Sequence, residues 1–228
     1  MYASHGGGII LRDELATDTL IITRKGTERI VRFAFEYAKN RTGSPLDGKR
    51  RVTCVDKSNV LRSYAFFRKV YDDVAKGYPE IEKDYAYVDA MTQWMVRKPE
   101  RYDVVVVENI FGDILSDLAA VLVGGMGLCP SMNAGERYAM FEPIHGSAPD
   151  HAGKNDVNPV ASILSGKMML EWLANKFCDR AAKTAAERIE EAVTSVLAEG
   201  KVRTYDLGGL SSTKEMGDAI ADKIRRSA

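Results

Sequence analysis

The segment RYDVVVVENIFGDILSDLAAVL (Arg101–Leu122) decides the fold class. Val104–Val107 is an unbroken run of β-branched apolar residues, a pattern typical of a buried strand that runs parallel to its neighbours. The run ends at Glu108, and we expect a helix to open at Asp113. This succession of strand, loop and helix predicts an α/β fold in which polar residues gather at the carboxyl edge of the sheet.

Two carboxylates follow the predicted strand at helical spacing. Asp113 and Asp117 are four residues apart, so both lie on one face of the helix. Carboxylates at that edge are natural oxygen ligands for Mg²⁺ or Mn²⁺. The alternative is that Asp113 is an N-cap and Asp117 a solvated residue favoured by the helix dipole. The spacing alone favours this alternative, because capping aspartates are common.

Composition excludes several classes of partner. The chain has 228 residues, 45% of them apolar, and a formal net charge of zero. Balanced charge without a basic tract argues against nucleic acid, and no apolar run reaches the ~18 residues of a membrane span. The N-terminus lacks the pattern of a secretory signal, and Cys54, Cys129 and Cys178 share no metal-ligand spacing. We therefore expect a cytoplasmic, soluble protein with no membrane and no nucleic-acid partner.

Polar residues also follow two earlier predicted strands. Lys57 and Asn59 come after Arg51–Val55, and Asp89 comes after Tyr85–Val88. Three such steps in series predict a shared cleft. A lysine at a helix start opposes the helix dipole, which suits Lys57 to proton transfer; the alternative is a loop lysine paired with a neighbouring aspartate. Asp89 taken by itself is predicted to be a cap.

The remaining chain predicts a hairpin and further helices. Residues 1–23 form two extended segments joined by a turn at 12–14, and so short a hairpin needs another surface, such as a second subunit. The stretch 130–137 is predicted to be a loop. Thr23 or Thr27 is predicted to cap a helix with the apolar positions Ile30, Phe33, Ala34 and Tyr37.

The stretch from Glu142 to Pro159 is irregular and contains HGSAPDHAGKNDVNP, which favours a binding loop. His145 has three possible roles: a buried hydrogen-bonded side chain, a catalytic base, or a stacking surface for a nucleotide. The amides around Gly146–Ala148 suit a phosphate or adenosine pocket. No GxGxxG segment follows a strand, so an ordinary dinucleotide fingerprint is absent from the sequence.

Six segments resemble one family, in the order in which the family has them, from about Tyr2 to Ala221. They are ITRKGTERIVRFAFEYA, DKSNVL, YVDAMTQWMV, ENIFGDILSD, FEPIHGSAPDHAGK and STKEMGDAIA. The family is that of the β-decarboxylating dehydrogenases, and the resemblance is closest to 3-isopropylmalate dehydrogenases. It implies an isopropylmalate-dehydrogenase-like α/β fold, with mixed sheets and flanking helices, in which the first part of the cofactor domain is missing.

The resemblance implies roles for the residues that match the family's charged positions. Asp113 and Asp117 resemble the metal ligands of one subunit, and Asp89 resembles the ligand that reaches in from its partner. Lys57 resembles the lysine that supports deprotonation of the substrate hydroxyl, also across the dimer. Asn59 beside it is expected to contact substrate or nicotinamide.

The resemblance also implies a cofactor loop that binds NAD. Asp150-His151 occupies positions where NADP-dependent relatives often carry Lys-Tyr, and a carboxylate there would accept from ribose hydroxyls and repel a 2′-phosphate. The residues that resemble the NAD loop are Glu142, His145, Gly146, Ser147, Ala148, Asp150 and Asn158.

Two domains follow from the same resemblance. Residues 1–123 are expected to form the inner dimerising and metal-binding domain, incomplete at its start, and 124–228 the C-terminal half of the NAD-binding domain. The family places further strands and the arginines that clamp the substrate carboxylate before the position of Tyr2. We therefore expect a truncated member that is impaired or inactive alone unless an upstream piece complements it.

The implied function is oxidative decarboxylation of a 2-hydroxy acid with NAD and Mg²⁺ or Mn²⁺, in a homodimer with a shared active site. The expected substrate is 3-isopropylmalate, of leucine biosynthesis, and Tyr2 resembles the tyrosine that protonates the enolate after carbon dioxide leaves. The alternatives are a tartrate-, D-malate- or isocitrate-type dehydrogenase, or a truncated non-catalytic subunit or dimerisation module. A Mg²⁺-dependent phosphohydrolase is a remote option that no P-loop supports.

Overall fold

The computed structural model describes residues 8–226 and divides the chain into two compact units. The N-terminal unit is Met1–Leu115 and the C-terminal unit is Ser116–Ala228. Their boundary lies within helix α4 (Asn109–Leu122), and the functions expected of the two domains stay predictions. Within residues 8–226, none of the helices combines the length and apolar character that a membrane crossing requires.

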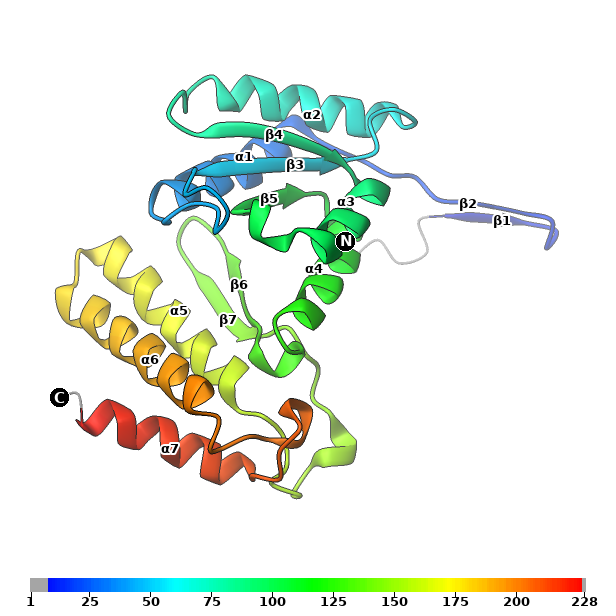
Figure 1. The fold of residues 1–228 in the computed structure, drawn as a ribbon. Helices are drawn as coiled ribbons and strands as arrows, with labels where there is room; N and C mark the ends of the chain where they lie inside the picture. Colours follow the sequence, from blue (N-terminus) through cyan, green and yellow to red (C-terminus); the bar gives the residue numbers. More distant parts are fainter. Residues whose placement is uncertain (1–7, 227–228) are drawn as a thin grey trace. The chain divides into compact units, whose positions relative to one another are not determined.

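The N-terminal unit is built on a three-stranded parallel sheet (Figure 1). Its strands are β3 (Arg51–Asp56), β4 (Glu82–Tyr87) and β5 (Val104–Val107), in the order β4-β3-β5. β3 pairs in parallel with both neighbours, so the three strands end at the same edge of the sheet. The prediction that β5 is parallel to its neighbour is confirmed.

Side-chain alternation along the strands assigns helices to both faces of this sheet. Val52 and Cys54 of β3 share an apolar cluster with α1 (Arg24–Lys39) and α2 (Arg62–Ala75). Val55 of the same strand lies in a second cluster with Met91 of α3 (Val88–Arg97). Since successive residues of a strand point to opposite faces, α1 and α2 cover one face and α3 the other. Every residue of the central strand β3 is consequently buried.

A short hairpin precedes this sheet. β1 (Ile9–Leu11) and β2 (Leu15–Thr17) pair antiparallel through a turn in which Arg12 and Asp13 have positive φ angles. All six strand residues are exposed, so the hairpin makes no core of its own. The predicted turn is confirmed, although β2 ends before the extended segment that we expected to reach Thr23.

The C-terminal unit is helical with one two-stranded ribbon. Helix α5 packs against both the ribbon and α6, and α7 packs on α6 (Figure 1). Its core is formed by Val160, Val193, Val196, Met216 and Ile220. The elements are β6 (Pro130–Ala134), β7 (Ala139–Pro143), α5 (Val160–Phe177), α6 (Arg180–Glu199) and α7 (Thr213–Arg226). Short 3-10 turns lie at Met126–Leu128, Pro149–His151 and Tyr205–Leu207 of this unit, and another lies at Pro99–Arg101 of the N-terminal unit.

One prediction for the C-terminal unit was wrong. The stretch 130–137, expected to be a loop, contains β6, because Pro130 stands at the first position of the strand, where a missing N–H is tolerated. Thr23 caps α1 as predicted, and of the four apolar positions named for this helix only Ala34 is buried. The helix carries two adjacent apolar stripes, and the buried one consists of Thr27, Val31, Ala34, Phe35 and Ala38.

Candidate functional site

The carboxyl edge of the parallel sheet brings two of the predicted residues into contact. The last residues of β3 and β4, Asp56 and Tyr87, are register partners, so the chain leaves both strands side by side. Lys57 Nζ then lies 2.7 Å from Asp89 Oδ1, and the Lys57 side chain is 24% exposed. The hydrogen bond from Lys57 holds the pKa of Asp89 below its usual value.

Lys57 lies in a loop rather than at a helix start, because α2 begins only at Arg62. It is paired with an aspartate, as in the alternative, but that partner is not the adjacent Asp56. The Asp56 side chain is fully buried and accepts two hydrogen bonds from Arg68, at 2.6 and 2.9 Å. Lys57 therefore turns instead to Asp89, which lies in the first turn of α3. The N-cap of α3 is Tyr87, so the prediction that Asp89 is a cap is wrong. Asn59 lies exposed in the turn between β3 and α2.

Helix α4 begins earlier than the sequence indicated. It starts at Asn109, so Gly112 and Asp113 lie inside it and Asp113 is not its N-cap. Glu108 takes that part: its Oε2 accepts from the Ile110 amide at 3.2 Å and from the Tyr64 hydroxyl at 2.8 Å. The sequence signal that we missed was Glu108 itself, whose side chain accepts from the amide two residues later.

The two predicted metal ligands of α4 are both exposed. Asp113 and Asp117 stand four residues apart on this helix, as expected. Their oxygen donors fit a hard divalent ion. Within residues 8–226, no three histidine, cysteine or acidic side chains of the single chain converge as a metal site. The predicted set takes Asp89 from a second copy, so it stays a prediction.

A cavity of about 680 Å³ lies in the C-terminal unit, against the irregular stretch 144–159. This volume falls within the range of small-molecule and cofactor pockets. Five residues predicted to contact NAD line it, namely His145, Gly146, Ser147, Ala148 and Asn158. Of the other two, Asp150 is exposed in the neighbouring 3-10 turn, and Glu142 lies on β7, where it accepts from Asn133 at 3.3 Å.

Asn158 shapes the wall of this cavity. Its Nδ2 donates to Asp206 Oδ2 at 3.0 Å and its Oδ1 accepts from the Val160 amide at 3.0 Å, at the start of α5. Gly127 packs directly on this pair, since a Cβ there would lie 2.8 Å from Asp206 Oδ2. Ala148, which also lines the cavity, adopts a left-handed conformation directly before the 3-10 turn at Pro149–His151.

Aromatic and acidic residues that sequence reasoning missed also line the cavity. Tyr205 stacks on His151 with ring centroids 5.6 Å apart and planes 5° apart, and His151 Nδ1 lies 3.1 Å from Asp156. Tyr205 and Asp206 come from a 3-10 turn far along the chain, where the only signal was the turn-forming segment YDLGG. His145 is half-buried, with Nδ1 2.9 Å from the Gly146 carbonyl oxygen, and its three possible roles stay predictions.

These features define an α/β protein with charged side chains at the carboxyl edge of a parallel sheet and a nucleotide-sized cavity in its second unit. The isocitrate/isopropylmalate dehydrogenase family model matches residues 2–220. The chain therefore belongs to the isocitrate/isopropylmalate dehydrogenase family. This confirms the resemblance read from the six segments.

Individual relatives carry different names at equal similarity. The 3-isopropylmalate/3-methylmalate dehydrogenase of Methanocaldococcus jannaschii is 46% identical over 208 residues, which are 91% of this chain and 60% of that protein. The homoisocitrate dehydrogenase of the same organism is 46% identical over 221 residues, 94% of this chain and 59% of that protein. The chain thus spans about 60% of the length of these curated relatives.

Solved structures agree on the fold. The isocitrate dehydrogenase of Methylococcus capsulatus matches with a TM-score of 0.83 and 44% identity, over 95% of this chain and 62% of that one. The β-decarboxylating dehydrogenase of Thermococcus kodakarensis matches with a TM-score of 0.81 and 40% identity, over 96% and 60%. The predicted fold class, an isopropylmalate-dehydrogenase-like arrangement of mixed sheets and flanking helices, is confirmed.

Proposed function

We propose that this chain carries the metal-binding and proton-transfer residues of a β-decarboxylating dehydrogenase that oxidises a 2-hydroxy acid with NAD. The observation that carries the proposal is the contact of 2.7 Å between Lys57 Nζ and Asp89 Oδ1 at the carboxyl edge of the sheet. An ammonium beside a carboxylate at that edge supplies a proton-transfer group next to a prospective metal ligand.

Each residue has a defined task in this proposal. A divalent ion held by Asp113 and Asp117 of one copy and Asp89 of the other would polarise the substrate oxygen, and NAD would accept the hydride. In its neutral amine form, Lys57 would accept the proton of the substrate hydroxyl through a solvent or side-chain relay. Asn59, exposed beside it, orients the substrate or nicotinamide. Tyr2, which lies outside the described residues, returns a proton to carbon after carbon dioxide leaves.

The cavity of the C-terminal unit is the proposed NAD site. Its loop amides at Gly146–Ala148 suit phosphate oxygens, and the stacked rings of His151 and Tyr205 suit an aromatic base. The carboxylates of Asp206, in the wall, and Asp150, on the adjoining turn, oppose an extra phosphate on the ribose. This charge supports NAD over NADP.

The assembly we propose is a homodimer with two shared sites. Lys57 and Asp89 contact each other within one chain, so a single copy would contribute both to the site of its partner. The exposed hairpin β1–β2 adds an apolar surface that a second copy would cover.

Two alternatives keep specific support. Relatives named for 3-isopropylmalate/3-methylmalate and for homoisocitrate are equally similar, at 46% identity, and a structure named for isocitrate is 44% identical. Homoisocitrate and isocitrate are therefore candidates beside 3-isopropylmalate, and the family resemblance adds tartrate and D-malate. A non-catalytic dimerisation module is the second alternative, because the chain spans about 60% of the length of the relatives.

The deciding experiment measures NAD reduction with each of these five acids in the presence of Mg²⁺ or Mn²⁺. We expect turnover with 3-isopropylmalate, a loss of roughly 10²–10⁴-fold in the Lys57→Met variant, and no change in Lys69→Met, an exposed lysine on α2. Thermal shifts with Mn²⁺ alone and NAD alone separate the alternatives. Metal and NAD binding without turnover of any acid would favour the non-catalytic module, and binding of neither would contradict the proposal.

A further inference from the structure

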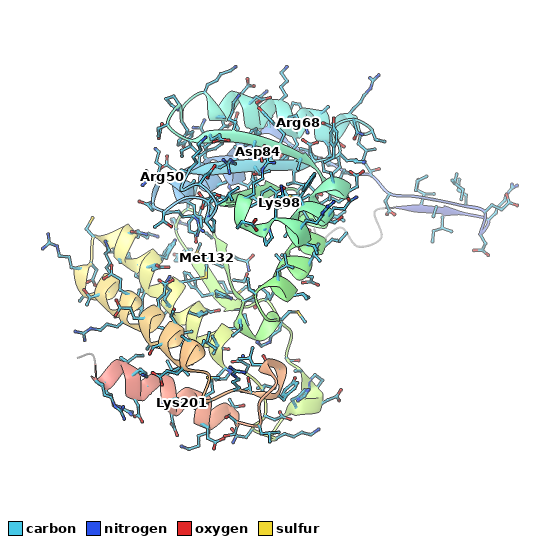
Figure 2. The ribbon with its side chains drawn as sticks, viewed as in Figure 1. Arg50, Arg68, Asp84, Lys98, Met132 and Lys201 are labelled. Atoms are coloured by element: carbon cyan, nitrogen blue, oxygen red, sulfur yellow. The ribbon has the colours of Figure 1, made fainter. Side chains whose placement is uncertain are left out.

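A second ion pair lies directly beside the Lys57–Asp89 pair. The side chain of Arg68, on α2, is 26% exposed and binds the fully buried carboxylate of Asp56 through Nε at 2.6 Å and Nη2 at 2.9 Å. Figure 2 shows Arg68 between α2 and the sheet. A two-pronged contact of this kind fixes the orientation of both planar groups. Asp56 therefore has a single defined orientation at the end of β3.

Asp56 in turn fixes the backbone around Lys57. Its Oδ1 also accepts from the Ser58 amide at 2.8 Å, so the residues on both sides of Lys57 are tied to one carboxylate. The Lys57 carbonyl accepts from the amides of Val60 and Leu61, at 3.1 and 3.0 Å. The direction in which Lys57 leaves the main chain is thus set by the Asp56–Arg68 pair.

The ring of Tyr87 links the two ion pairs. Arg68 Cζ lies 5.2 Å and Lys57 Nζ lies 5.8 Å from its centroid, both within the range of a cation–π contact. Tyr87 is the last residue of β4 and the register partner of Asp56. Arg68 therefore touches both groups that define the path of Lys57: the carboxylate behind its backbone and the ring beneath its side chain.

We propose that Arg68 and Tyr87 are positioning residues that hold the Lys57 ammonium against Asp89. A lysine side chain has four rotatable bonds, and a stacked ring with a fixed backbone reduces the number of rotamers it samples. Arginine is needed at position 68 because a lysine cannot bind Asp56 with two parallel hydrogen bonds. The value of this positioning for catalysis rests on the proposed function, whereas the positioning itself does not.

The test observes Lys57 directly in the whole chain, without turnover. Lysines are converted to ¹³C-dimethyl-lysines, which keep their charge, and their methyl resonances are observed by NMR. The Lys57 signal is assigned by its loss in Lys57→Arg. The chemical shift of this signal in Asp89→Asn defines the state in which Lys57 is released from residue 89. We expect the signal to move at least halfway to that position in Arg68→Lys and in Tyr87→Leu. We expect it to stay in place in Tyr87→Phe, which retains the ring, and in Lys69→Met, a neighbouring exposed lysine of α2.

Arg68→Lys keeps a positive charge beside Asp56, and circular dichroism checks that each variant is folded. If Arg68→Lys fails to fold, the pair Tyr87→Leu and Tyr87→Phe decides. A Lys57 signal that stays at the wild-type position in folded Arg68→Lys and Tyr87→Leu overturns the proposal, as does an equal shift in Lys69→Met.

Kinetics separate this proposal from the proposed function. If the chain turns over substrate, Arg68→Lys should lower kcat about tenfold and leave KM within about twofold, because orientation of a reacting group is lost but substrate contacts remain. A Lys57 signal that responds in a chain without turnover supports the positioning and counts against the enzymatic role. An active enzyme whose signal does not respond overturns the positioning alone.

Discussion

Asn158 and Asp206 are joined by a hydrogen bond of 3.0 Å that ties the start of α5 to the 3-10 turn at Tyr205–Leu207. Asn158 is 6% exposed, and Asp206 accepts at the same time from the hydroxyl of the fully buried Thr204, at 2.5 Å. The wall of the cavity is therefore held by polar contacts rather than by apolar packing alone. Such a network is stable only while every member has a partner.

Substitution Asn158→Ala is expected to destabilise the C-terminal unit and to weaken the binding of NAD proposed for its cavity. It leaves Asp206 without its amide donor and the Val160 amide without its acceptor, at a cost of about 1–3 kcal/mol. Denaturant unfolding and calorimetry with NAD measure the two effects. The control is Asn133→Ala, which removes only an exposed contact with Glu142. Equal effects of the two substitutions would show that the Asn158 network has no special role.

Substitution Gly127→Ala tests how tightly the same wall is packed. The new Cβ would lie 2.8 Å from Asp206 Oδ2 and 3.0 Å from the Asn158 Cβ, and neither neighbour can move without breaking its hydrogen bonds. We expect a loss of about 1–3 kcal/mol in the free energy of unfolding. Gly217→Ala on α7, where a Cβ meets nothing within 4 Å, should instead add about 0.5–1 kcal/mol. A stable Gly127→Ala protein would mean that the wall adapts.

Patterns with a local cause could be read from the sequence. The apolar run Val104–Val107 predicted a strand, and the polar residues after three strands predicted a common edge, which the parallel register of β3, β4 and β5 provides. The parallel pairing agrees with the rule that strands buried under helices on both faces of a sheet run parallel. The contact between Lys57 and Asp89 is its direct result.

Features that depend on distant segments could not be read in the same way. Tyr205 and Asp206 reach the cavity from a turn about fifty residues after the loop, so no local spacing marked them. In α1 the sequence shows two apolar stripes, and only the packing of α2 and the sheet determines which one is buried. The start of α4 was misplaced because Glu108, rather than Asp113, satisfies its first amides.

Substitution Arg51→Met tests the amino end of the sheet, away from the proposed site. The Arg51 side chain is 6% exposed and binds Glu82 at 2.9 Å and Asp47 at 2.7 Å. We expect a loss of roughly 2–3 kcal/mol at pH 7, less than for a fully buried pair because Glu82 is partly exposed to solvent. The control is Lys49→Met, whose 3.6 Å contact with Glu82 lies in solvent and should contribute under about 0.5 kcal/mol.

The two ion pairs of Arg51 make the stability difference between wild type and Arg51→Met depend on pH. Hydrogen bonds from Arg51 hold the pKa of Glu82 and that of Asp47 below their usual values. A carboxylate with a depressed folded pKa stabilises the protein above its unfolded pKa, and this contribution is lost as the pH falls through the folded pKa. The gap between wild type and Arg51→Met should therefore narrow from about pH 5 to pH 3. A gap that stays constant over that range would show that the ion pairs are not its source.

The last prediction concerns the hairpin β1–β2. Ile10 is 74% exposed and Leu11 is 53% exposed on three-residue strands that form no core of their own. A surface of this kind is stable in water only when another surface covers it, and the proposed homodimer provides one. The double substitution Ile10→Glu/Leu11→Glu should therefore raise the dimer dissociation constant at least about 10²-fold, because the two side chains point to opposite faces of the ribbon and at least one charge would enter the apolar contact. Sedimentation velocity over a concentration series measures the change, and Arg12→Glu, at the tip of the turn, is the control. Unchanged dimerisation in a double variant with a normal circular dichroism spectrum would show that a second copy does not cover the hairpin.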